Sequence, residues 1–261
     1  MRMMDTHYSC LYNILKDIAL DKELSPLLIF KGGTSLMFFY DLSRFSLNLE
    51  FTLVDRKQEL LVFKRLLKIV SMYGTICEKV LDPFGAKVVL EYGEEGWPLE
   101  VEISNQYWRE ETDLLCLDGF SLNVMSLSDI YTHKLIALGK GDNVAGKEIF
   151  DIWFLGEKYI MPNGDIVMKW VGRSLVEQLS LDISILEKLT NDQLMSSLEP
   201  LLLPEKAKWA NTSLLPEAIA SLQMRVGAEK LKKRFRRGIS LGVKTRNDDH
   251  NQSIKSQTCE F

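Results

Sequence analysis

The spacing of apolar residues predicts that the first half of the chain mixes helices with strands. Apolar side chains recur at helical spacing from Tyr8 to Ile18 and again across residues 56–73, which predicts two amphipathic helices. Alternation of apolar and polar residues, bounded by turn residues, instead predicts strands with one buried face. The predicted strands are 46–54, 75–81, 86–92, 99–104 and 120–125.

Helical spacing dominates the remainder of the chain. Ser126 and Asp129 form a helix-start pattern, and a further helix is predicted over 147–159. Beyond Pro162 the pattern is helical throughout, interrupted by prolines, with helices predicted at 165–178, 183–189, 191–203 and 216–237. We therefore expect an α+β fold, with a mixed sheet and flanking helices followed by a helical C-terminal part.

A pair of glycines stands at the centre of the first half. Gly32 and Gly33 follow an apolar run, and Thr34 and Ser35 open a short apolar helix. Glycines let the backbone approach a ligand closely, and the free N–H groups at a helix start attract phosphate. The motif predicts a phosphate site, although an ordinary turn and helix would have the same spacing.

Polar residues lie along one face of two predicted strands. Asn48 and Glu50 alternate with apolar residues, and Glu102 does so in the strand 99–104. If the two strands are neighbours, these oxygens can surround a metal ion beside a bound phosphate. The alternative is that they form a solvated strand face.

Two lysines and an aspartate on the next helices are further candidates. Lys134 lies within an apolar stripe, where its charge is costly to bury without an anionic partner. It can neutralise a nucleotide phosphate or extend to the surface. Lys147 and Asp151 lie four residues apart, which is also the spacing of an ordinary surface ion pair.

Taken in order, these motifs resemble a known family. The sequences GGTSL and RFS, the polar strand residues, and then Lys134, Lys147, Glu148 and Asp151 resemble the AbiEii-type nucleotidyltransferases over residues 30–155. That family comprises toxins of abortive-infection systems and belongs to the DNA polymerase β-like superfamily. The resemblance implies a nucleotidyltransferase domain over 1–160. The helical pattern beyond Pro162 predicts a helical domain over 161–238, and the polar, aperiodic end of the chain predicts a flexible tail over 239–261.

The resemblance also implies a role for each candidate residue. Asn48, Glu50, Glu102 and Asp151 would be catalytic, and the first three would hold Mg²⁺ or Mn²⁺. Nucleotide phosphates would be bound by Gly32, Gly33, Thr34, Lys134 and Lys147, while Arg44 and Ser46 would brace the metal strand. The implied partners are an NTP substrate, an RNA acceptor such as tRNA, and an antitoxin.

Several positions depart from the family pattern. Asn48 stands where Asp is usual, Glu50 and Glu148 replace Asp, and Glu100 replaces Lys. A neutral amide lacks the charge that drives Mg²⁺ binding, so we expect weak metal binding and slow or altered transfer. Two hypotheses follow: an active or attenuated transferase toxin, and a non-catalytic nucleotide-binding or interaction module.

Composition and charge limit the ligands and the cellular location that we expect for this protein. A net charge of -4 argues against general nucleic-acid affinity, and four scattered cysteines with three distant histidines support neither a zinc site nor a disulfide framework. With no membrane-length apolar run or signal-peptide core, we expect a cytoplasmic protein that does not bind membranes. The basic run from Lys230 to Arg237 predicts either a solvated helix cap or an RNA-backbone patch.

Overall fold

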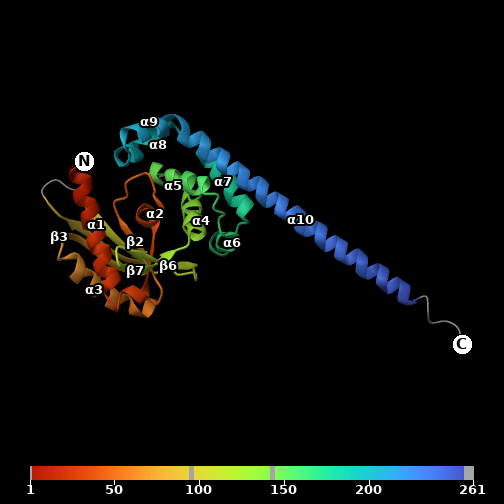
Figure 1. Ribbon diagram of the computed structural model, residues 1–261, viewed down its shortest axis with the longest axis horizontal. Coiled ribbons are helices and arrows are strands. Elements are labelled where there is room, and N and C mark those ends of the chain that lie inside the picture. The colour runs from red at the N-terminus through yellow and green to blue at the C-terminus, as the bar shows by residue number, and fades with distance from the viewer. Residues whose placement is uncertain (1, 94–96, 142–144, 256–261) are drawn as a thin grey trace.

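A seven-stranded mixed sheet forms the centre of the first half of the chain (Figure 1). The computed structural model describes residues 2–93, 97–141 and 145–255, with side chains described from residue 4 to residue 235. The strand order is β3-β4-β5-β2-β1-β7-β6. The strands are β1 (Leu28–Lys31), β2 (Leu49–Leu53), β3 (Thr75–Asp82), β4 (Gly85–Glu91), β5 (Leu99–Ser104), β6 (Thr112–Leu117) and β7 (Phe120–Met125).

The strand register places the polar residues of β2 and β5 side by side. β2 and β5 run parallel with Glu50 opposite Glu102, whereas β1 and β2 run antiparallel with Lys31 opposite Glu50. The sequence prediction that the two polar strands are neighbours is therefore confirmed. Because opposed residues of paired strands lie on the same face of a sheet, Lys31, Glu50 and Glu102 share one face.

The opposite face of the sheet carries the first hydrophobic core. Apolar side chains such as Phe30, Phe51 and Val101 pack there against α1 (Arg2–Leu20) and α3 (Glu59–Val70), which follows a short 3-10 turn, Arg56–Gln58. The helix α2 (Gly32–Tyr40) starts directly at the end of β1. The apolar positions of β2 and β5 are thus buried under α1 and α3, which leaves their polar positions for the other side.

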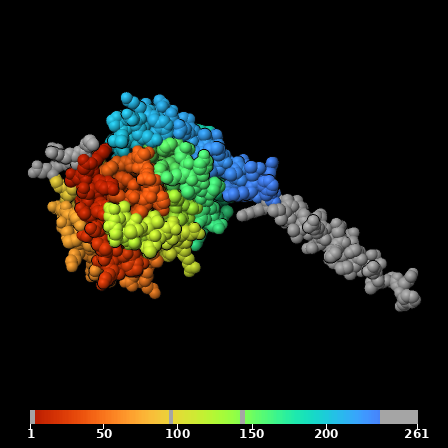
Figure 2. Space-filling model, in the orientation of Figure 1, coloured from red at the N-terminus to blue at the C-terminus, as the bar shows by residue number. Residues whose placement is uncertain are grey.

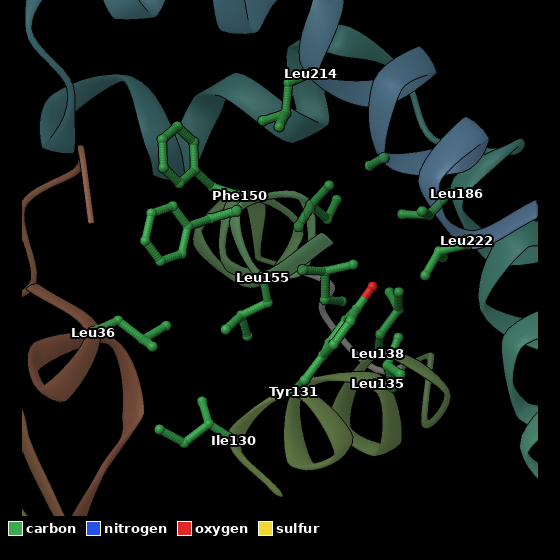
Figure 3. Packing of buried hydrophobic residues seen from close by; sticks show 14 of the residues in the cluster. Leu36, Ile130, Tyr131, Leu135, Leu138, Phe150, Leu155, Leu186, Leu214 and Leu222 are labelled. Carbon is green, nitrogen blue, oxygen red and sulfur yellow. The ribbon is translucent and has the colours of Figure 1, made fainter. Parts of the chain in front are cut away.

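A second core joins the end of the first half to the C-terminal helices. Tyr131 from α4 (Leu127–Leu138) and Phe150 from α5 (Gly146–Glu157) pack with Leu214 and Leu222 (Figure 3). The C-terminal helices are α6 (Gly164–Val171), α7 (Leu175–Leu186), α8 (Asn191–Leu198), α9 (Pro204–Trp209) and α10 (Leu215–Lys255). Figure 2 shows α8 and α9 lying against the surface formed by α2 and α5.

Several elements differ from the sequence prediction. The helix predicted at 183–189 begins inside α7, which ends at Leu186, and α9 was not predicted. The helix predicted at 165–178 is two helices, because Gly172 ends α6 in a left-handed conformation and Ser174 with Glu177 forms a capping box that starts α7. Strand β6 was not predicted, since its side chains are mostly exposed and it is defined by pairing with β7. α10 continues past the predicted end at residue 237, so that residues 239–255, expected as a flexible tail, are helical; residues 256–261 lie outside the described part.

Across the described residues, none of the helices has both the length and the apolar character that crossing a lipid bilayer requires.

Candidate active site

Charged side chains form a row across the open face of the sheet. The row runs from Lys31 on β1 through Glu50 on β2 and Glu102 on β5 to Lys87 on β4, with each residue opposite the next in the strand register. The backbones of Lys31 and Glu50 pair in the sheet, but their side chains make no ion pair or hydrogen bond within the described residues. The row therefore brings the two predicted metal-binding glutamates together and leaves Glu50 available to a ligand.

The electrostatics of the row follow from partial burial and from like charges. Partial removal from solvent raises the pKa of the Glu102 carboxyl, and the carboxylates of Glu50 and Glu100 raise it further. Burial lowers the pKa of Lys31, and the nearby carboxylates of Glu50, Glu110 and Glu102 only partly offset this effect. A divalent cation beside Glu50 and Glu102 would relieve the repulsion between their carboxylates.

Asn48 lies immediately before β2, next to this row. Its amide nitrogen donates a hydrogen bond to Glu100 Oε2 at 3.1 Å, and Lys87 Nζ lies 3.3 Å from Glu100 Oε1. The amide oxygen of Asn48 accepts no hydrogen bond in the described part of the chain. Asn48 and Glu100, two of the positions identified from the sequence as departures, therefore contact each other through this hydrogen bond.

The paired glycines make room for two charged side chains. Gly32 has φ +78, and a Cβ there would lie 2.5 Å from Glu50 Oε1, while a Cβ on Gly33 would overlap the guanidinium of Arg44. The start of α2 has no side-chain cap from Lys31. Thr34 is buried, and its hydroxyl hydrogen-bonds Ser46 Oγ at 2.9 Å and also the carbonyl of Asn48. Thr34 and Ser46 thus fix the segment that leads into β2.

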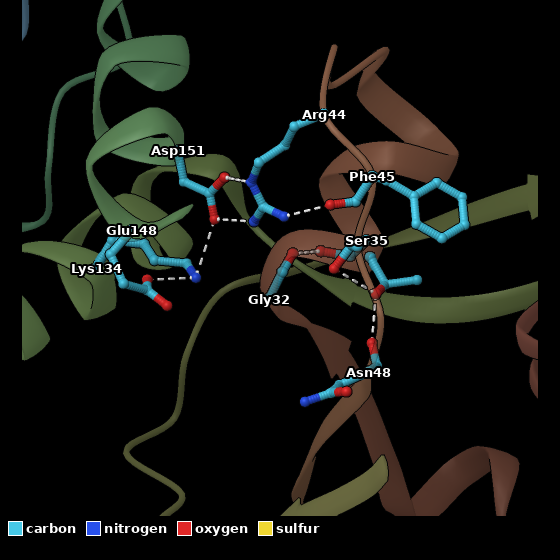
Figure 4. A network of polar contacts seen from close by, with 10 residues as sticks. Gly32, Ser35, Arg44, Phe45, Asn48, Lys134, Glu148 and Asp151 are labelled. Atoms are coloured by element: carbon cyan, nitrogen blue, oxygen red, sulfur yellow. Dashed lines mark hydrogen bonds and ion pairs between the residues drawn. The ribbon is translucent and has the colours of Figure 1, made fainter. Parts of the chain in front are cut away.

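A buried ion cluster joins this segment to α4 and α5 (Figure 4). Arg44 donates from Nε and Nη2 to the two oxygens of Asp151, both at 2.7 Å. Lys134 Nζ lies 2.6 Å from Glu148 Oε2 and 3.0 Å from Asp151 Oδ2. The predicted anionic partner of Lys134 thus comes from the protein itself, and the predicted contact between Asp151 and Lys147 is replaced by contacts to Arg44 and Lys134.

The pKa shifts within this cluster favour the charged forms: the pKa of Asp151 is lowered and that of Lys134 is raised. Burial raises the pKa of Asp151, but Arg44 and Lys134 outweigh it and hold that pKa below its usual value. Burial lowers the pKa of Lys134, and Glu148 and Asp151 more than reverse the effect. Asp151 therefore stays ionised with both oxygens engaged, an arrangement suited to holding cations in position.

Three hollows surround Glu50. The largest, of about 250 Å³, lies over β4 and β5 and includes Glu102. A second, of about 180 Å³, lies between Gly32, His133 and Lys134, and a third, of about 70 Å³, includes Lys147. Lys147 has no ion-pair partner among the described residues. The predicted site residues thus converge on one region, with Asp151 buried behind Lys134.

Lys31 is the site residue that sequence reasoning missed. It directly precedes the paired glycines, and it lines two of the three hollows. Its position as the last residue of a buried strand was the signal that could have identified it, because such a side chain emerges at the edge of a site.

The comparison with protein-family models decides the family. The model for the nucleotidyl transferase AbiEii toxin of type IV toxin–antitoxin systems matches residues 13–214. The chain belongs to this family. The AbiEii match covers the sheet, the glycine turn, the ion cluster and most of the C-terminal helices, so the resemblance of the motifs is confirmed. A comparison with curated protein sequences gave no match.

Two solved structures from Helicobacter pylori show the same fold. JHP933 from Helicobacter pylori is 17% identical with a TM-score of 0.54, and the match covers 93% of this chain and 99% of that one. A candidate nucleotidyltransferase from H. pylori is 18% identical with a TM-score of 0.53, covering 87% and 95%. The nucleotidyltransferase toxin MenT4 from Mycobacterium tuberculosis is 16% identical with a TM-score of 0.48, covering 86% and 91%. The predicted nucleotidyltransferase fold with a helical C-terminal region is confirmed.

Proposed function

We propose that this AbiEii-family protein transfers a nucleotide from an NTP to an RNA acceptor, such as a tRNA. The observation that supports the proposal is the in-register pairing of Glu50 and Glu102 beside the N-terminus of α2, which has no side-chain cap. Carboxylates next to a helix start combine a cation site with a phosphate site. We further propose that the departures at Asn48 and Glu50 make the transfer slow.

The cation would be held by few protein ligands. Within the described residues no group of three or more His, Cys, Asp or Glu side chains is arranged to bind a metal. Mg²⁺ sites in phosphoryl-transfer enzymes commonly use one or two carboxylates together with substrate phosphates, so Glu50 and Glu102 with the amide oxygen of Asn48 fit Mg²⁺ or Mn²⁺. The ion would neutralise phosphate charge and orient the triphosphate.

The chain's own cations would bind the triphosphate. Lys147 lines a hollow on the helix side of Glu50 and has no ion-pair partner in the described segments, and Lys134 lines the same hollow. The positive end of α2 adds to their field. In the transfer, the acceptor hydroxyl oxygen bonds to the α-phosphorus and loses its proton to water. The bond from the α-phosphorus to the bridging oxygen breaks, and pyrophosphate leaves with its electron pair.

The family also supports a biological setting. Membership of a type IV toxin–antitoxin family favours a cognate antitoxin as partner. We propose that the protein acts in the cytoplasm, in phage defence by abortive infection, and that the antitoxin restrains it.

Transfer of a radioactive α-phosphate from each NTP to cellular RNA, with Mg²⁺ or Mn²⁺, tests the proposal. We expect labelled RNA from the natural chain and more from Asn48→Asp with Glu50→Asp, since restored acidic ligands should raise metal affinity about 10–100-fold. Glu102→Gln should abolish labelling while the protein stays folded.

The alternative is a non-catalytic nucleotide-binding or interaction module. It is favoured by the hydrogen bond from Asn48 to Glu100, which joins two positions that depart from the family pattern. Absence of labelling from both the natural chain and the double variant, with NTP binding retained, would support this alternative.

A further inference from the structure

An exposed aromatic ring projects from the turn between β3 and β4. The Phe84 residue is 72% exposed, yet its backbone is fixed on both sides. Its N–H donates to Asp82 Oδ1 at 2.7 Å, and its carbonyl accepts from the N–H of Asn105 at 2.9 Å. Arg56 donates to the carbonyl of Pro83 at 3.2 Å. A large apolar side chain on a rigid, exposed turn is suited to binding a flat partner with little loss of conformational freedom.

Phe84 borders the same hollow as the catalytic candidates. The hollow of about 250 Å³ is lined by this ring together with Glu50, Glu102, Lys31 and Lys87. The turn lies close against β5, because Gly85 has φ +152 and a Cβ there would overlap the carbonyl of Ile103. The aromatic ring, two cations and three carboxylates, those of Glu50, Glu102 and Asp82, therefore line one space.

The other hollows suit the donor nucleotide. The start of α2, Lys134 and Lys147 all lie on the opposite side of Glu50 from Phe84, where positive charge gathers for a triphosphate. The space under the β3–β4 turn remains for a second substrate. Glu50 borders every one of these hollows, so a group in the large hollow and a phosphate in the others can meet at that carboxylate.

We propose that the hollow beneath Phe84 binds the terminal nucleotide of a single-stranded RNA acceptor, with its base stacked on the Phe84 ring. A nucleotide offers the three groups that this hollow can recognise: a flat base for the ring, a phosphate for Lys31, and a hydroxyl that can reach Glu50 and Glu102. Stacking of bases on aromatic side chains tolerates any base, so Phe84 would position the acceptor without selecting its sequence. The inference rests on the proposed transfer to RNA and adds where the acceptor binds.

Binding of a short fluorescent single-stranded RNA, measured by anisotropy without NTP, tests the inference. Phe84→Ala should weaken binding about tenfold or more, whereas Phe84→Tyr should retain it because the ring is kept. Leu114→Ala is the matched control, because Leu114 is 73% exposed on β6, at the opposite edge of the sheet. It should bind RNA as the natural chain does.

A second RNA locates the contact. An RNA whose last nucleotide lacks its base should bind the natural chain about as weakly as Phe84→Ala binds intact RNA, and the two changes together should add little, because both remove one interaction. The inference is overturned if Phe84→Ala binds intact RNA like the natural chain, or if the two effects are additive. If either of these results is obtained while RNA is still labelled, the proposed transfer stands and only the acceptor site is wrong. If RNA is not labelled but its binding depends on Phe84, the proposed transfer is wrong and the RNA site stands.

Discussion

Two charged regions flank the paired glycines, and they differ in whether their charged side chains are paired with one another. On the side of α4 and α5, Arg44, Asp151, Lys134 and Glu148 pair with one another, and Asp151 is fully buried. On the sheet side, Glu50 has no ion-pair partner in the described residues, and its neighbour Glu102 faces further carboxylates. Family motifs contribute to both regions, but among the described residues only the sheet side retains carboxylates without an ion-pair partner that a cation can neutralise.

The difference separates support from ligand binding. A buried charge must be paired, so the ion cluster is required whether or not substrate is present. The sheet carboxylates are partly exposed and tolerate their repulsion because water screens it. We therefore expect substitutions in the ion cluster to affect folding first, and substitutions in the sheet row to affect ligand binding first.

The largest effect is expected from Asp151→Ala. Removing this carboxylate leaves the buried guanidinium of Arg44 without its anionic partner, which should lower the free energy of unfolding by about 3–5 kcal/mol. Urea unfolding monitored by circular dichroism measures the change. Glu50→Gln is the matched comparison, and should change stability by less than about 1 kcal/mol while preventing RNA labelling. Equal decreases in stability for the two variants would contradict the separation of roles.

Sequence patterns predicted the elements that carry the candidate site better than the contacts within it. The alternation around Glu50 and Glu102 correctly indicated strands with one polar face, because that pattern follows from burial of the other face under α1 and α3. The helix start at Ser126 was also predicted correctly, since its side chain accepts from the N–H of Asp129. Both signals are local.

Pairings between distant residues had no such signal. The contact from Arg44 to Asp151 spans 107 positions, and nothing in the spacing of either motif distinguishes Arg44 from Lys147 as the partner. The glycines were interpreted as room for a ligand, whereas in the structure they make room for Glu50 and Arg44. Such space-filling relations depend on the tertiary fold.

A second buried aspartate sharpens the comparison through pH. Asp182 on α7 is as buried as Asp151, but its Oδ1 accepts only from Gln178 Nε2 at 2.9 Å, and its Oδ2 has no partner among the described atoms. Burial raises the pKa of Asp182 to about 8, whereas the cations beside Asp151 lower the pKa of that group. The same burial thus accompanies opposite shifts of the two pKa values, according to whether a cation is in contact.

The pKa of Asp182 predicts that stability falls as pH rises. The unfolded chain loses this proton near pH 4 and the folded chain only near pH 8, so between these values the folded state binds more protons. The free energy of unfolding should fall by about 2 kcal/mol from pH 5 to pH 7. Asp182→Asn should remove most of this slope in urea unfolding, and Asp192→Asn, at an exposed position on α8, should leave it unchanged. A slope that persists in Asp182→Asn would exclude this group as its source.

The smallest expected effect concerns the cations of α10, where paired and unpaired charges again lie side by side. Because the helix continues to Lys255, Lys230, Lys233 and Arg234 do not lie at its C-terminus, and a helix-cap role has no basis. All three are exposed and have no ion-pair partner in the described residues, whereas Lys232 Nζ lies 2.7 Å from Glu229 Oε1. Neutralising the three unpaired cations should reduce the slope of log affinity for RNA against log salt by about 1 for each phosphate that the protein no longer binds. Lys232→Gln should change it less, and equal slopes for the natural chain and the triple variant would show that these cations do not bind RNA.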